Sequence, residues 1–116
     1  MPTYELLREG EWTIDGRMLT PDTITWKDPI PLMRRADEIG QDGSEIVGIV
    51  SSIRRVGNRI VGNTSVELDE DQLLTCDVDH LGQMFEHLGG GMEITGARLV
   101  AAHVNAKDQY PWKDNE

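Results

Sequence analysis

The sequence has very little cysteine, and this scarcity excludes one common way of stabilising a small protein. Cys76 is the single cysteine among 116 residues, so no disulfide can form within the chain. We therefore expect either a reducing compartment or a protein that is indifferent to redox conditions.

Long apolar runs are also missing, as is a basic, apolar N-terminus. No hydrophobic stretch approaches the ~18 residues that a membrane-spanning helix needs, so the sequence predicts no membrane span. Residues 1–5, MPTYE, have neither the basic start nor the apolar stretch of a secretory signal. We therefore expect no signal peptide.

Positive charge is scarce. The chain has 11 Lys and Arg against 21 Asp and Glu, for a net charge of −10. Such a chain repels phosphate backbones, which argues against nucleic-acid binding. The negative charge favours solubility and a partner with basic patches. What the sequence does contain is 38% hydrophobic residues, enough for one core in one domain.

Most of the chain has the pattern of short β-strands joined by tight turns. Asp15-Gly16 is a strong hairpin signal, because both central turn residues need positive φ. A second hairpin is predicted to turn at Val56-Gly57-Asn58. The predicted strands are residues 4–7, 11–14, 17–19, 23–26, 45–55, 59–66 and 94–104.

A predicted helix at about residues 69–88 is the exception. Apolar residues recur there in steps of four and three, the period of an amphipathic helix. They are Leu74, Val78, Leu81, Phe85 and Leu88. We therefore expect a mainly β fold: a β-barrel or strongly curled antiparallel sheet, with one amphipathic α-helix late in the chain. The expected division is a single domain over residues 1–106 and a polar tail over residues 107–116.

Several segments taken together resemble one protein family. They are residues 11–17 (EWTIDGR), 25–26 (TW), 29–33 (PIPLM), 47–55 (VGIVSSIRR) and 94–102 (ITGARLVAA). This set resembles the capsid maturation (prohead) proteases of tailed bacteriophages, especially phages infecting actinobacteria. The resemblance covers residues 10–55 well and residues 92–106 weakly. It implies a β-barrel serine protease that cleaves scaffold regions of the capsid protein during head assembly.

The residues that carry catalysis in this family are missing. The family's histidine follows the Pro-x-Pro-Leu stretch, and Ala36 stands at that place, followed by Asp37. The family's serine lies on a strand after the helix, but the last serine here is Ser65. A serine needs an adjacent base to become a nucleophile, and alanine cannot take a proton. The resemblance therefore implies a shortened, catalytically dead relative rather than an enzyme.

The remaining chemistry-bearing residues favour structural roles. Cys76 and His80 supply only two metal ligands, too few to close a zinc site. His103 would act as a displaced base only beside a nucleophile that the sequence does not identify. Four serines are nucleophile candidates by residue type alone: Ser44, Ser51, Ser52 and Ser65. We expect no cofactor and no bound metal.

Two small groups are candidates for partner binding. Arg34 and Arg35 form a basic pair in an acidic chain, and they either balance acidic neighbours or contact a partner. Tyr110 and Trp112 form an aromatic cluster in the polar tail. They either anchor the tail in a partner or pack against the chain's own barrel, and the sequence leaves both alternatives open.

The resulting hypothesis is a non-enzymatic phage virion structural protein, a capsid decoration or minor capsid protein that binds and stabilises the head shell. Its expected partner is the major capsid protein, with self-association on the lattice. Its expected location is the virion, assembled in the host cytoplasm. Two alternatives stay open, because fold does not fix function: a divergent active capsid maturation serine protease with a relocated base such as His103, and a soluble adaptor or inhibitor domain.

Overall fold

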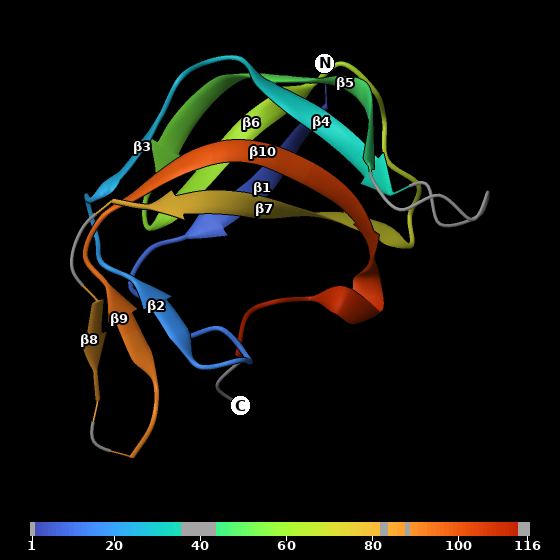
Figure 1. Cartoon of the computed structure of the whole chain (residues 1–116). Helices are drawn as coiled ribbons and strands as arrows, with labels where there is room; N and C mark the ends of the chain where they lie inside the picture. Colours follow the sequence, from blue (N-terminus) through green and yellow to red (C-terminus); the bar gives the residue numbers. More distant parts are fainter. Residues whose placement is uncertain (1, 36–43, 82–83, 88, 114–116) are drawn as a thin grey trace.

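The structure is a computed structural model that describes residues 2–35, 44–81, 84–87 and 89–113, and this part of the chain is mainly β-sheet (Figure 1). The strands are β1 Thr3–Arg8, β2 Arg17–Leu19, β3 Ile24–Trp26, β4 Ile30–Arg35, β5 Ser44–Val56, β6 Arg59–Thr64, β7 Gln72–His80, β8 Met84–Glu86, β9 Met92–Ile94 and β10 Ala97–Ala106. A short 3-10 helix, η2 (Lys107–Gln109), follows β10. No helix in the described residues is long and apolar enough to cross a membrane.

The strand β10 is the centre of a seven-stranded mixed sheet. On one side it pairs antiparallel with β7, from Ala97 opposite His80 to Ala106 opposite Gln72. On its other side it pairs in parallel with β3 and then with β4. From β4 the sheet continues antiparallel through β5 and β6 to β1. The large sheet therefore has β1 at one edge and β7 at the other, and the short β3 pairs only with β10.

A second, three-stranded sheet has the order β2-β9-β8. The strands β2 and β9 run parallel, and β8 and β9 form an antiparallel hairpin. This hairpin, residues 84–94, projects from the body of the molecule and is called the arm below (Figure 1). The small sheet adds Leu19 and Ile94 to the core inside the curl of the large sheet.

The β-rich character of the chain is confirmed, and so is the hairpin from β5 to β6. Gly57 has a φ of 64° at its turn, a conformation that glycine adopts without steric cost. The hairpin predicted at Asp15-Gly16 is reduced to a single bridge between Trp12 and Met18. The residues after that turn form β2, which pairs with β9 instead.

The predicted helix is wrong in the described part of residues 69–88, where the chain forms β7 and β8. The helical spacing hid a second pattern in the same segment. Leu74, Cys76 and Val78 occupy every second position with polar residues between them, which is the period of a strand. Pairing with β10 provides backbone hydrogen bonds along one edge of β7, so tertiary context selected the strand.

Of the two expected forms, a β-barrel or a strongly curled antiparallel sheet, the barrel is not formed, and the curled sheet is mixed rather than purely antiparallel. The large sheet curls until β1 and β7 lie side by side, but the two strands do not pair. We call the space between them the seam. Tyr110, Pro111 and Trp112 line the seam together with residues of both strands, such as Tyr4 and Leu74. Side chains of the C-terminal segment therefore occupy the place where a barrel would have backbone hydrogen bonds.

The C-terminal segment packs on its own sheet, which is one of the two alternatives that the sequence left open. Trp112 is only 4% exposed and belongs to the core. The Ile14 N–H donates to the Pro111 carbonyl over 2.8 Å, and the Lys113 N–H donates to the Trp12 carbonyl over 2.9 Å. An indole this deeply buried in its own chain is not available as an anchor for a partner.

A buried ion pair connects three strands at one end of the large sheet. Glu9, which follows β1, is 3% exposed, and its Oε1 accepts a hydrogen bond of 2.9 Å from Arg55 Nε on β5. Arg55 Nη2 also donates to the Ile24 carbonyl of β3 over 2.5 Å. The other Glu9 oxygen accepts the Asp22 N–H over 2.8 Å. A buried carboxylate needs such partners because desolvation penalises its charge.

We expect Trp112→Ala to lower the free energy of unfolding by about 3–5 kcal/mol, because it empties a core position in the seam. Urea unfolding followed by circular dichroism measures the change. Lys113→Ala, which alters an exposed neighbour, is the matched control and is expected to stay within about 0.5 kcal/mol of the original chain. Equal stability of the two variants would show that the tail is not part of the folded core.

A second stability prediction concerns Gly62 on β6. A Cβ at this position would lie 2.5 Å from Val50 Cγ1 and 3.3 Å from Leu6 Cδ1. We expect Gly62→Ala to destabilise the fold by about 1–3 kcal/mol through overpacking. At Gly57 a Cβ would meet nothing within 4 Å, and asparagine tolerates a positive φ. Gly57→Asn is therefore the control, and a thermal midpoint for Gly62→Ala as high as that of the control would contradict the packing.

Candidate functional site

The residues predicted from the family resemblance fall partly outside the described structure. Ala36 lies in residues 36–43, which are not described, so its role as the site of a lost base stays a prediction. Arg34 and Arg35 end β4, where the backbone register places them opposite Glu45 and Ser44 of β5. The Arg34 side chain is exposed, and its contact with a partner stays a prediction.

His103 lies on the outer face of β10 and is paired with an acid. Its Nε2 is 2.6 Å from Asp77 Oδ2 on the neighbouring strand β7. The same pair of strands carries two other polar contacts, Arg98 to Asp79 and Asn105 to Thr75. The candidate serines lie elsewhere, on β5 and immediately after β6, and β4 separates both strands from β10 in the sheet. The structure thus pairs His103 with a carboxylate but does not bring it together with these serines.

Cys76 and His80 are brought to one pocket by β7, not by a helix. Residues four apart on a strand share a face just as they do on a helix, so both side chains point the same way. Within the described residues, no group of three or more metal-ligating side chains comes together. Burial, together with the negative charge of Asp77, raises the pKa of the Cys76 thiol, which therefore stays protonated.

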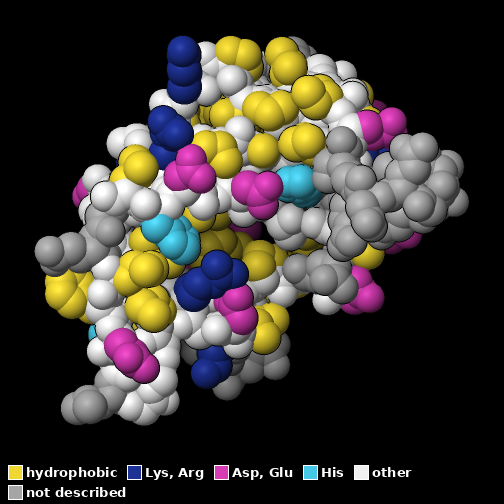
Figure 2. Space-filling view, in the orientation of Figure 1, with side chains coloured by type: hydrophobic (Ala, Val, Ile, Leu, Met, Phe, Trp, Pro, Cys, Tyr) yellow, Lys and Arg dark blue, Asp and Glu magenta, His cyan; other side chains and the backbone are white. Residues whose placement is uncertain are grey.

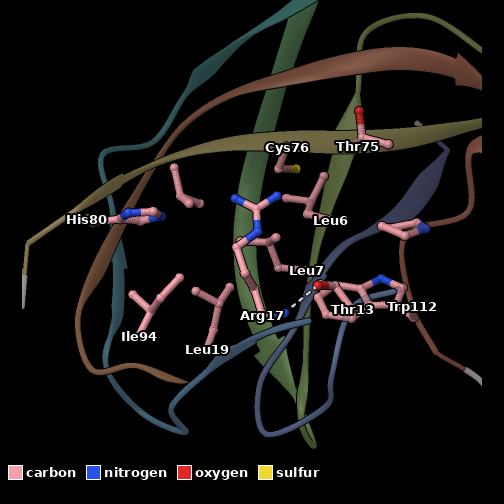
Figure 3. Close-up of a pocket in the computed structure, with 12 residues that line it drawn as sticks. Leu6, Leu7, Thr13, Arg17, Leu19, Thr75, Cys76, His80, Ile94 and Trp112 are labelled. Carbon is pink, nitrogen blue, oxygen red and sulfur yellow. Dashed lines mark hydrogen bonds between the residues drawn. The ribbon is translucent and has the colours of Figure 1, made fainter. Parts of the chain in front are cut away.

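The pocket that these residues line is called the seam pocket below. It has a volume of about 190 Å³. One wall is formed by β1 and β7 at the seam, and the opposite wall by β2 and β9 of the small sheet (Figure 3). Its apolar lining comes from Leu6, Leu7, Leu19, Val78, Ile94, Pro111 and Trp112. Figure 2 shows a hollow between the two sheets, with apolar side chains at its bottom and a basic side chain next to an acidic one at its mouth.

Polar residues of this lining come from both walls. Thr13 and Arg17 belong to β2 and the turn before it, and Thr75, Cys76 and His80 belong to β7. In Figure 3 the Arg17 side chain extends from β2 toward Leu6 and Cys76 on the opposite wall. The arrangement can therefore hold an apolar group at the bottom and a polar or negative group beside Arg17.

The position of Arg17 is set by the turn that precedes β2. Its backbone N–H donates to Thr13 Oγ1 over 2.9 Å, and its Nη2 donates to Asp15 Oδ2 over 2.6 Å. The hydrogen bonds from Arg17 and from the Thr13 hydroxyl hold the pKa of Asp15 below its ordinary value. Asp15 therefore stays ionised and paired with Arg17 near neutral pH. Sequence reasoning missed this site, because residues 11–19 indicate only two short strands joined by a turn at Asp15-Gly16.

The arm carries a second surface that the sequence reasoning missed. Met84 and Phe85 of β8 are 52% and 51% exposed, and Leu81 nearby is 59% exposed. Leu81 and Phe85 belong to the apolar stripe that predicts the buried face of a helix, and Met84 lies in the same segment.

The raised pKa of Cys76 has a direct consequence for its reactivity. Because the thiolate is the reactive species, alkylation by iodoacetamide is expected to be at least about ten-fold slower than in the urea-unfolded chain at pH 8. The rate should rise with pH up to about pH 10 without a plateau, since the raised pKa lies above that range. Mass spectrometry follows the reaction at this single cysteine. A plateau below about pH 9 would contradict the assigned shift.

Comparison with known proteins returned no relative: no family model, no curated protein and no solved structure matches this chain. A function for the chain is therefore inferred from its own geometry. Two features stand out in the described residues, the seam pocket with its charged side and the arm with its exposed apolar side chains.

Proposed function

We propose that this chain is a non-enzymatic virion structural protein, a decoration or minor capsid protein that binds a phage head shell. The observation that carries the binding role is the exposed apolar surface of the arm. The head shell as the partner comes from the resemblance of residues 10–55 to phage maturation proteases. The arm supports a protein-binding role whichever partner is correct.

The arm offers both an apolar surface and an open strand edge. Within the described residues β8 pairs only with β9, so its other edge presents free backbone donors and acceptors. Such an edge accepts an added strand from a partner. Met84 and Phe85 are adjacent on β8, so they point to opposite faces of the hairpin. A strand added there would bury apolar surface on both faces, at about 25 cal/mol per Å².

Contacts at the turn end of the arm, where β8 passes into β9, hold it ready for binding. His87 Nε2 is 3.0 Å from Glu93 Oε1, across the hairpin. The His87 ring stands edge-on to Trp12, with ring centroids 5.2 Å apart. The His87 N–H also donates to the Gly91 carbonyl over 2.9 Å. An arm that is already ordered loses less conformational entropy on binding, which favours affinity.

Charge indicates what the partner surface contains. The chain carries a net charge of −10, and Glu86 at the end of β8 is exposed. An extended partner segment with apolar and basic side chains is therefore complementary. We propose that the major capsid protein provides this segment, and that neighbouring copies of the chain meet on the lattice.

The arm is tested by the double substitution Met84→Ser and Phe85→Ser. Co-sedimentation with purified heads of the phage that encodes the chain is expected to fall at least about ten-fold, because two exposed apolar anchors are removed. The matched control is Ile46→Ser with Ile49→Ser, which removes two apolar side chains of β5 that are 69% and 44% exposed. That variant is expected to sediment with heads like the original chain.

Quantitative mass spectrometry of mature virions provides the second readout. A simple ratio of this chain to the major capsid protein is expected for a lattice-bound protein. Absence of the chain from virions would overturn the virion assignment. Equal loss of binding in the arm variant and the β5 variant would instead show that the arm is not the contact surface.

A further inference from the structure

The seam pocket has no role in the proposed binding of a head shell, although it is built from both sheets and the C-terminal segment. Five of its apolar lining residues are less than 8% exposed: Leu6, Leu7, Leu19, Ile94 and Trp112. These side chains are fixed in the core, so the pocket is a preformed feature of the fold. Preformed apolar cavities with a few polar groups are the usual form of small-molecule sites.

The size of the pocket restricts the apolar part of a ligand. Its volume of about 190 Å³ is slightly larger than the ~150 Å³ cavity that is known to accommodate benzene in a protein core. One six-membered ring or one branched alkyl group therefore fits, with room for a short polar substituent. A fused ring system or a long acyl chain exceeds this volume.

Charge restricts the polar part. Arg17 lines the pocket, whereas its partner Asp15 does not. Both hydrogen bonds of the guanidinium to Asp15 come from Nε and Nη2 and end on the same oxygen, Oδ2. The Nη1 group keeps its donors for a ligand. His80 adds a further donor beside it, and the polar side chains of the lining include no carboxylate.

We propose that the seam pocket binds a small carboxylic acid made of a single ring or branched alkyl group and one carboxylate. The apolar group fills the space against Leu19, Ile94 and Trp112, and the carboxylate accepts hydrogen bonds from Arg17. An amine would meet the guanidinium charge, and a neutral amide would lose the charge-assisted bond. Binding is non-covalent, because the half-buried Cys76 thiol stays protonated.

The test uses phenylacetate as the probe and the full chain in solution. Two-dimensional ¹H–¹⁵N NMR follows the Trp112 indole N–H during titration to about 20 mM, a range suited to a ligand of this size. Phenylacetamide has the same shape without the charge. We expect phenylacetate to shift the Trp112 signal saturably and to bind about ten-fold more tightly than phenylacetamide.

Three variants identify the source of the charge. Arg17→Gln is expected to weaken phenylacetate binding about ten-fold, and Asp15→Asn to strengthen it about three-fold by releasing the guanidinium. Arg98→Gln is the matched control. Arg98 has the same side-chain exposure as Arg17, 53%, and is likewise paired with an aspartate, but it lies on the outer face of β10. Its substitution is expected to leave binding unchanged.

Each outcome decides the proposal. No saturable shift in a chain that remains folded overturns the site, and equal binding of the acid and the amide overturns the choice of a carboxylate. Equal weakening by Arg17→Gln and Arg98→Gln would show that only overall charge matters. The arm is a separate surface from the seam pocket. The Met84→Ser, Phe85→Ser variant is therefore expected to bind phenylacetate like the original chain, even if it no longer binds heads.

Discussion

The ion pair between Glu9 and Arg55 is the constraint on which the arrangement of the large sheet depends. Glu9 follows β1, Arg55 belongs to β5, and the guanidinium also binds the β3 carbonyl of Ile24. These strands are distant in sequence. The Arg55 side chain is 34% exposed and partly solvated, but removing it would leave the buried Glu9 carboxylate without its charged partner. The pair therefore ties the end of β1 to β5 and β3 across the large sheet.

The curl creates a problem that the C-terminal segment solves. Once β1 and β7 lie side by side without pairing, apolar side chains of both strands face an open seam. Trp112 fills this space, and the Arg8 guanidinium lies 5.9 Å from its ring. An indole packed between β1 and β7 leaves irregular space, whereas backbone hydrogen bonds between the two strands would close the seam. The seam pocket is that space, bounded on its far side by the small sheet.

The β-rich class, the β5–β6 hairpin and the closing strand could be predicted from local patterns, because turn chemistry and alternation act over a few residues. The helix could not be excluded, since Leu74, Val78 and Leu81 satisfy a helical period while residues 74–79 also alternate. The candidate site was largely missed. Arg17 and His80 line the same pocket only because β2 lies opposite β7, and the local sequence of neither strand predicts this contact.

The sequence by itself determined a small, acidic, single-cysteine chain rich in strands, because composition and turn residues are properties of the chain alone. It also predicted that the large apolar surface of Trp112 packs against another surface, either of a partner or of the same chain. Only the tertiary structure decided that this partner is the seam of the same chain, that β7 is a strand, and that Met84 and Phe85 remain exposed. These outcomes depend on contacts between residues far apart in sequence, and no local pattern encodes which distant strand completes a surface.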